Sequence, residues 1–498
     1  MTRLFAQNLL KYSLQILRER LGILFLTGWI CGVYLFSCIQ RFQAFVGDSP
    51  EVFVGMGLAV AIGIWLGLPA SAALSNRESE STTESNPDVG KMSITFFVLS
   101  LWSLCFPMLL NQLNQVLHLV TVQQISNFVF LTGLMTLAAM ALIMPAVFWC
   151  SRLFWLTAKN TGFDLNTSLQ LNRHVARYLT GIGLALITAA YWIVPLFGWN
   201  VSLILPVGMV FVLCCGPWIL AYAKPYLPET PQWLKVDSAK AELEPLFKPS
   251  ENDQRESASI VPLMIRGCSF PVSLAVGILF VMLSRVLFQL YPDSLYLKVT
   301  IWAAFLCGIG AAFSFIRSRG ITQQIQTAAC LSLGTGIIGV SCLALFPLLV
   351  SCMLYANAYI EIAQILAVVR GGLTAIVFSL LGWCWGGWLN LAIQTRQMKT
   401  DPFTIYTLPV WQPFCFLAGI FFSFWLIGGG IADVKTIIVL TSLGLLCLTA
   451  VVWFSHLRIP KTRFQLSMGI FSLAVLILGF VFHQNYDVRH SAKLLFAT

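Results

Sequence analysis

The chain has 498 residues, of which 58% are hydrophobic and only 10% are charged, and its mean hydropathy is +0.82. Such a composition excludes a soluble globular domain. The net charge of +10 does not indicate nucleic acid as a partner, because the basic residues lie in short clusters at the ends of apolar runs, where they would face the cytoplasmic leaflet. The sequence therefore predicts an all-α, polytopic protein of the bacterial inner (plasma) membrane, with the lipid bilayer as its partner.

The first half, 1–223, opens with an amphipathic stretch over residues 1–20. This stretch is either an interfacial helix or a cytoplasmic extension of the first span. Six apolar runs follow, each close to the length of about 20 residues that an α-helix needs to cross the hydrocarbon core. These candidate spans are 21–40, 52–73, 93–113, 127–150, 177–197 and 201–223.

A hydrophilic segment, 224–262, then separates two membrane halves. It contains the sequence KVDSAKAELEPLFKPSENDQRES, and prolines such as Pro228 and Pro245 argue against a long helix there, so we expect a solvated cytoplasmic connector. The second half, 263–483, brings the total to about 13 spans and is followed by a tail, 484–498. Its candidate spans are 267–290, 297–316, 327–355, one within the long run 359–392, 409–427, 434–454 and 464–482.

Lysine and arginine recur on alternate loops, and the intervening loops are nearly free of them. Because cytoplasmic loops are enriched in basic residues, this alternation predicts a cytoplasmic N-terminus. The predicted cytoplasmic loops carry, for example, Arg77 and Lys91, Arg152 and Lys159, Arg317 and Arg319, and Arg396 and Lys399.

Two halves joined by a cytoplasmic connector are typical of a parallel internal repeat of the major-facilitator kind. Arg41 near the end of the first span is followed by Gly63, and Arg285 near the end of the seventh is followed by Gly308. Small residues in apolar helices are also common close-packing sites, so this local match leaves a shared ancestry of the halves open.

Ionisable residues in or beside the spans are candidates for substrate binding, because a charge near the bilayer centre costs at least about 2.5 kcal/mol. Arg370 interrupts a long apolar run and is followed at once by Gly371 and Gly372. Either an outside interfacial helix precedes the span, or the helix breaks at the glycines and points Arg370 into a cavity. The candidate substrate-binding residues are Arg370, Arg285, Glu361 and Arg41.

Two of these candidates have plainer explanations. Arg285 lies near the end of its run and can extend its guanidinium to the interface. Glu361 cannot readily neutralise Arg370 within one helix, because nine residues separate them by roughly 13 Å. The spans contain no paired carboxylates, histidine cluster or nucleophile–base spacing, and the 14 cysteines form no CxxC pair. We therefore expect no enzyme activity, catalytic residue, metal or cofactor.

The tail YDVRHSAKLLFAT resembles the junction in bacterial proteins that fuse a major-facilitator-like membrane region to a spermidine-synthase-like domain. In the second half, LSRVLFQLY and FLCGIGAAFSFIRSRG are similar to the opening spans of that membrane region, although Val281 stands where the family often has an acidic residue. The resemblance implies that the aminopropyltransferase-like catalytic domain would begin where this chain ends. Its implied partner is a methyltransferase-fold soluble domain or an adjacent subunit.

Two functions are consistent with these features. The first is a non-catalytic membrane module of such a fusion protein, which binds or handles a polyamine or related metabolite. The second is a major-facilitator-like secondary transporter of small solutes that uses Arg370, Arg285 and the interface between the halves. The scarcity of acidic residues in the spans favours the module, because a coupled exporter of cations usually needs a buried carboxylate.

Overall fold

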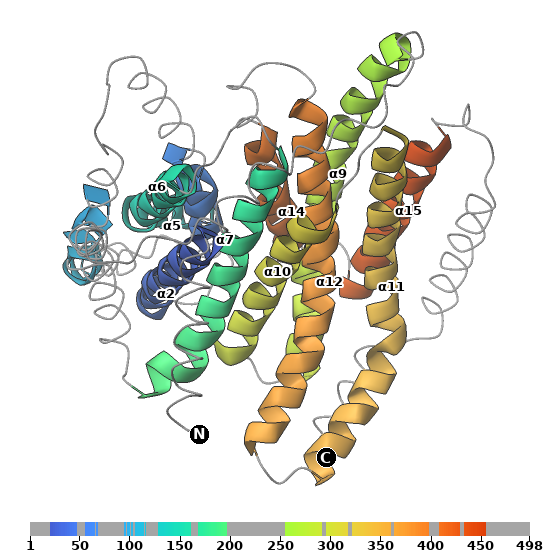
Figure 1. The fold of residues 1–498 in the computed structure, drawn as a ribbon. Helices are drawn as coiled ribbons and strands as arrows, with labels where there is room; N and C mark the ends of the chain where they lie inside the picture. The colour runs from blue at the N-terminus through green and yellow to red at the C-terminus, as the bar shows by residue number, and fades with distance from the viewer. Residues whose placement is uncertain are drawn as a thin grey trace, which may run out of the picture.

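The structure is a computed structural model and describes residues 20–46, 55–64, 66–67, 94–95, 97–99, 101–102, 105–113, 115, 128–160, 168–196, 254–290, 295–316, 321–359, 363–397, 408–428 and 433–454. The regular elements in this part of the chain are helices (Figure 1). Six of them are long and apolar enough to cross a membrane, or seven if one bent pair counts as a span. The expected all-α membrane bundle is confirmed for these residues, whereas the total of about 13 spans stays a prediction.

Helices far apart in the sequence lie side by side. Figure 1 shows α2, α5 and α6 on one side, α7 and α10 in contact in the middle, and α11 and α15 on the other side. The predicted spans 201–223 and 464–482, most of the connector and the tail lie outside the described residues. The elements are α2 (Arg20–Val46), α5 (Phe128–Leu142), α6 (Met144–Asn160), α7 (Ser168–Thr188), the π-helical turn η1 (Ala189–Ile193), α9 (Gln254–Leu290), α10 (Leu295–Phe315), α11 (Ile321–Tyr359), α12 (Ala363–Gln397), α14 (Leu408–Gly428) and α15 (Val434–Phe454).

Part of the outer surface of the bundle is apolar, as α14 and α15 show. Trp411 and Trp425 on α14 are 61% and 53% exposed, and Leu440 on α15 is 61% exposed. Side chains of this size facing outward on neighbouring helices suit contact with lipid better than contact with water. Each tryptophan lies within one turn of an end of α14, and tryptophan is enriched near the headgroup levels of membrane proteins.

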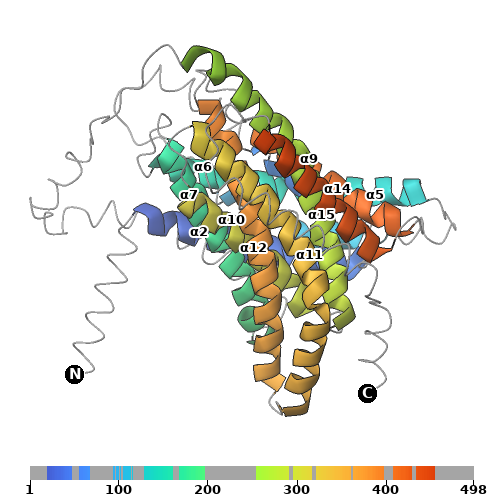
Figure 2. The ribbon, with the colours of Figure 1, turned by 90° about the vertical axis from the view of Figure 1, so that its right-hand side faces the viewer.

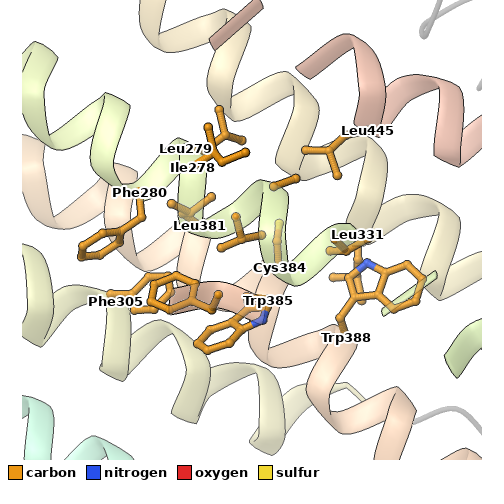
Figure 3. Close-up of a cluster of buried hydrophobic side chains, with 14 of the residues drawn as sticks. Ile278, Leu279, Phe280, Phe305, Leu331, Leu381, Cys384, Trp385, Trp388 and Leu445 are labelled. Carbon is orange, nitrogen blue, oxygen red and sulfur yellow. The ribbon is translucent and has the colours of Figure 1, made fainter. Parts of the chain in front are cut away.

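The largest buried cluster lies where α9, α10, α12 and α14 meet (Figure 3). The rings of Phe305, Trp385 and Phe416 stack on one another with centroid separations of 4.5 to 5.5 Å. Phe280 meets two of these rings edge-on. Trp385 Nε1 donates a hydrogen bond of 3.1 Å to Ser273 Oγ, which satisfies the polar atom of the stack. These contacts fix the relative rotation of the four helices.

The long run 359–392 does not contain a helix break. α12 continues without interruption through Gly371 and Gly372, and among the described residues no separate interfacial helix precedes it. Both alternatives drawn from the sequence are therefore wrong. Two glycines disfavour a helix by about 1 kcal/mol each, but a break inside hydrocarbon would leave several backbone groups without hydrogen bonds at a higher cost.

The fourth predicted span, 127–150, is also more complex than expected. It consists of α5 and α6, whose axes bend by 45° at the junction. The helical pattern of hydrogen bonds continues through the bend. The N–H of Ile143 donates to Ala139 O, and the carbonyl of Ile143 accepts from the N–H of Val147. α6 runs on to Asn160, so Arg152 lies in a helix and not in the loop where the sequence predicted it.

Several helices extend beyond their predicted bounds, and three of them bear on the connector or on the thickness of the bilayer. α9 begins at Gln254, inside the stretch expected to be connector. α11 has 39 residues and α12 has 35, which correspond to about 58 and 52 Å at 1.5 Å per residue. Both lengths exceed the roughly 30 Å of the hydrocarbon core. Figure 2 shows the adjoining ends of α11 and α12 projecting together beyond the other helices.

Candidate functional site

Of the four candidate residues predicted from the sequence, the structure describes the side chains of two, Arg41 and Arg285. Glu361 lies outside the described residues, and for Arg370 the structure describes only the backbone, within α12. Arg41 is half-buried on α2, and Arg285 is half-buried on α9. The substrate site that these residues were expected to form therefore stays a prediction.

Reciprocal glycine contacts join pairs of helices that run in the same direction. A Cβ on Gly28 of α2 would collide with the carbonyl of Tyr178 on α7, and a Cβ on Gly181 would collide with the carbonyl of Phe25. α9 and α14 meet in the same way, because Gly277 faces the carbonyl of Phe416 and Gly419 faces that of Leu274. In each pair the two backbones approach so closely that a side chain does not fit between them.

Two other pairs of helical segments also pack closely through glycines. Gly308 on α10 faces the carbonyl of Ser379 on α12, and Gly382 on α12 faces that of Phe305. In the first half, Gly63 lies against the carbonyl of Met144 on α6, with a Cβ-to-oxygen distance of 2.9 Å. The helical segment 55–64 thus packs on α6 as α10 packs on α12.

The antiparallel pair α7–α10, which we call the seam, joins helices that precede the predicted connector to helices that follow it. A Cβ on Gly183 of α7 would lie 2.9 Å from the carbonyl oxygen of Ala303 on α10. Farther along, a Cβ on Gly310 of α10 would lie 2.9 Å from the carbonyl oxygen of Ala176 on α7. As the residue number rises on one helix it falls on the other, so the helices run in opposite directions. Small residues on both helices bring the backbones into contact at two levels.

At a third level the seam is polar. Tyr191 lies in η1, and its hydroxyl is 3.0 Å from Thr300 Oγ1 on α10. Thr300 Oγ1 already donates to the carbonyl of Tyr296 at 2.8 Å, so the phenol of Tyr191 is the donor in the contact between the helices. The Tyr191 and Tyr296 rings also touch, with centroids 5.0 Å apart. We call Tyr191, Tyr296 and Thr300 the polar clasp.

The polar clasp reaches the part of α12 that the sequence singled out. A Cβ on Gly371 would lie 3.9 Å from the Tyr191 hydroxyl oxygen and 4.0 Å from Thr300 Cγ2. Gly371 follows Arg370 directly in the sequence. The backbone at this candidate residue therefore lies beside the point where α7 meets α10, which is the interface that the transporter hypothesis invokes.

Arg285 has an aromatic neighbour. Its guanidinium carbon lies 5.6 Å from the ring centroid of Phe424 on α14, a distance typical of a cation–π contact. α9 packs against α11, α12, α14 and α15, and none of these four helices contains an Asp or Glu; Asp433 lies one residue before α15. A basic side chain in such surroundings favours an anion over a cation as its ligand.

Sequence reasoning missed the polar clasp and the role of the glycines. The apolar pattern shows nothing of a π-helical turn, which adds one residue to a helical turn and often occurs at functional sites. Gly63 and Gly308 were noted as a weak internal match, but their packing partners depend on the tertiary structure. Neither the family models nor the curated proteins compared with this sequence match it.

Proposed function

We propose that this chain is a major-facilitator-like secondary transporter whose two halves move a small anion across the membrane. The observation that carries the proposal is the symmetry of helix pairing. Counting the predicted spans in order, α2 and α7 are the first and fifth, and α9 and α14 are the seventh and eleventh. Adding six to the span numbers of the first pair gives the span numbers of the second pair. Reciprocal glycines join the helices of both pairs.

Two further sets of contacts support the same relation. The second and fourth spans pack through Gly63, and the eighth and tenth pack through Gly308. The contact between the fifth and eighth spans, α7 and α10, has a counterpart between the second and eleventh, where a Cβ on Gly57 would meet Leu417 Cδ2 at 2.5 Å. Parallel repeats related in this way are the basis of major-facilitator transporters, in which one half rocks against the other around a central site.

Relative helix directions add independent support. α7 and α10 are antiparallel, and consecutive spans α9 and α10 also run in opposite directions (Figure 1), so α7 and α9 run the same way. Two spans run in the same direction when one further span lies between them in the sequence. The sequence predicts such a span at 201–223, outside the described residues. The alternation of basic loops and the packing of the helices therefore favour the same order of spans.

The charges favour an anion as the solute and argue against the polyamine that the family resemblance implies. The described spans carry basic side chains such as Arg41, Arg285 and Lys298, and their sequences contain no Asp or Glu. A polyamine carries several positive charges and would be repelled, since like charges disfavour one another strongly at low dielectric. Arg285 and Arg370 are the residues that we assign to the anion.

A second candidate function is the non-catalytic membrane module, a static partner for a soluble enzyme domain. The continuous α7–α10 seam favours it, because close backbone contacts at two levels and the polar clasp at a third resist separation of the halves. Transport would still be possible if α7 and α10 slide along each other, because the residues between them are small. The transporter and the static module therefore differ in whether α7 and α10 move, and both are consistent with the same contacts.

Flux measurements in proteoliposomes distinguish these candidates. We expect uptake of one or more of the labelled anions acetate, succinate and phosphate, and no uptake of spermidine. Arg285→Gln should lower anion uptake about tenfold or more, because it removes a charge-assisted contact worth roughly 1.5–3 kcal/mol. Arg177→Gln, which changes an exposed arginine on α7, is the matched control and should leave uptake unchanged.

Two outcomes of the flux measurements would contradict the proposal. Uptake of spermidine without uptake of anions would reject the assignment of the solute. Absence of flux for every solute, with correctly folded protein, would reject transport and favour the static module.

A further inference from the structure

Arg152 occupies an unusual position on α6. Between Ala146 and Ala158 every residue of α6 is buried except three, Phe148, Trp149 and Arg152. With the half-buried Pro145 they follow the spacing i, i+3, i+4, i+7, which places them in one stripe along the helix. Between Ala146 and Ala158 this stripe is the only partly exposed face of α6, and it is apolar apart from Arg152.

The guanidinium of Arg152 is held against an aromatic ring. Its central carbon lies 5.1 Å from the ring centroid of Trp149, one turn earlier on the same face. Phe148 packs edge-on against Trp149, with ring centroids 5.3 Å apart, and thereby supports the indole. The cation is thus oriented along the outer surface of the bundle instead of being free to move in solvent.

No protein carboxylate is placed to neutralise this cation among the described helices. α6 packs against α2 and α5, against the segment around Gly63 and Gly67, and against Tyr178 of α7. None of these elements contains an Asp or Glu within its bounds, and neither does α6 itself. An arginine on an apolar face, with no carboxylate on the described elements that pack around it, offers its charge to an anion from outside the protein.

We propose that Arg152 and Trp149 form a binding site for the phosphate of an anionic phospholipid headgroup. Arginine offers planar paired donors that match a phosphate geometrically. Tryptophan is the residue most characteristic of the headgroup level of a bilayer, and the apolar remainder of the stripe suits an acyl chain. A free phosphate ion shares the headgroup chemistry but has no use for the apolar stripe, so the two sources are separable by experiment.

Native mass spectrometry of the purified full-length chain tests this site. The protein is titrated with phosphatidylglycerol or with phosphatidylcholine of identical acyl chains, and in a separate arm with inorganic phosphate. We expect phosphatidylglycerol to bind at least about tenfold more tightly than phosphatidylcholine, and inorganic phosphate not to displace it at equal concentration.

Variants assign the effect to the stripe. Arg152→Gln should abolish the preference for phosphatidylglycerol, whereas Arg152→Lys should keep part of it because the charge remains. Trp149→Leu should weaken the preference a few-fold, in line with the loss of one cation–π contact. Arg285→Gln, which removes another half-buried arginine that faces an aromatic ring, is the matched control and should leave lipid binding unchanged.

Three results would overturn the proposal. They are equal binding of the two lipids to the wild type, an unchanged preference in both Arg152→Gln and Trp149→Leu, and displacement of the lipid by inorganic phosphate at equal concentration. The site does not depend on transport, because Arg285→Gln is expected to reduce flux and spare lipid binding. Failure of one proposal is therefore distinguishable from failure of the other.

Discussion

A single methyl group at Gly308 tests the close packing of α10 on α12. In the structure a Cβ at this position would meet the carbonyl group of Ser379, with its carbon only 2.9 Å away, and the amide nitrogen of Trp383 at the same distance. These are backbone atoms, so no side chain can rotate away to make room. Gly308→Ala therefore forces the two helices apart, and overpacking of this kind costs about 1–3 kcal/mol.

The matched control is Gly444→Ala on α15. Nothing lies within 4 Å of a Cβ at Gly444, so alanine there should be neutral or should stabilise the helix by up to about 1 kcal/mol. Thermal unfolding in detergent, followed by circular dichroism, should show a midpoint that falls by about 2–6 °C for Gly308→Ala and does not fall for Gly444→Ala. If both variants unfold at the same temperature, the backbone contact between α10 and α12 is wrong.

Two further predictions concern polar groups. Tyr191→Phe and Thr300→Val should each destabilise the protein by about 0.5–1.5 kcal/mol, because each removes the hydrogen bond of the polar clasp; the double variant should cost clearly less than the sum, and strict additivity in a thermal double-mutant cycle would contradict the contact. Gln412→Leu should raise the unfolding midpoint, because Gln412 is fully buried and both polar atoms of its side chain have no hydrogen-bond partner; a lower midpoint would mean that the amide does have a partner, and Gln412→Glu, which introduces a buried charge, should lower it.

The bounds of three helices were the most predictable part of this fold. α10, α14 and α15 begin and end close to the bounds of the apolar runs, because in each case the run is about as long as the bilayer is thick. The prediction failed where glycines or a basic residue suggested that a helix ends and the helix in fact continues. Gly371 and Gly372 do not break α12, since a break would expose backbone groups to hydrocarbon, and the basic Arg152 does not end the helix in which it lies.

The candidate site was less predictable than the helices. Charge rarity identified Arg285 and Arg370, but the sequence does not reveal that Phe424 faces the first of them or that the backbone beside the second lies near Tyr191. The polar clasp joins residues more than a hundred positions apart. Hydroxyl groups on apolar helices are common and usually bond to their own backbone, as Thr180 and Ser284 do here, so composition alone cannot identify the pair that links two helices.

The paired length of α11 and α12 also has a mechanical consequence. Each of these helices is at least about 20 Å longer than the hydrocarbon core is thick, so part of each projects beyond the bilayer. A stiff rod of that reach converts a tilt of about 10° within the lipid into a sideways displacement of roughly 3.5 Å at its tip. A spin label or fluorophore attached at the tip would therefore move farther than the buried part of the helix. A distance measurement could then detect small rearrangements of the buried helices.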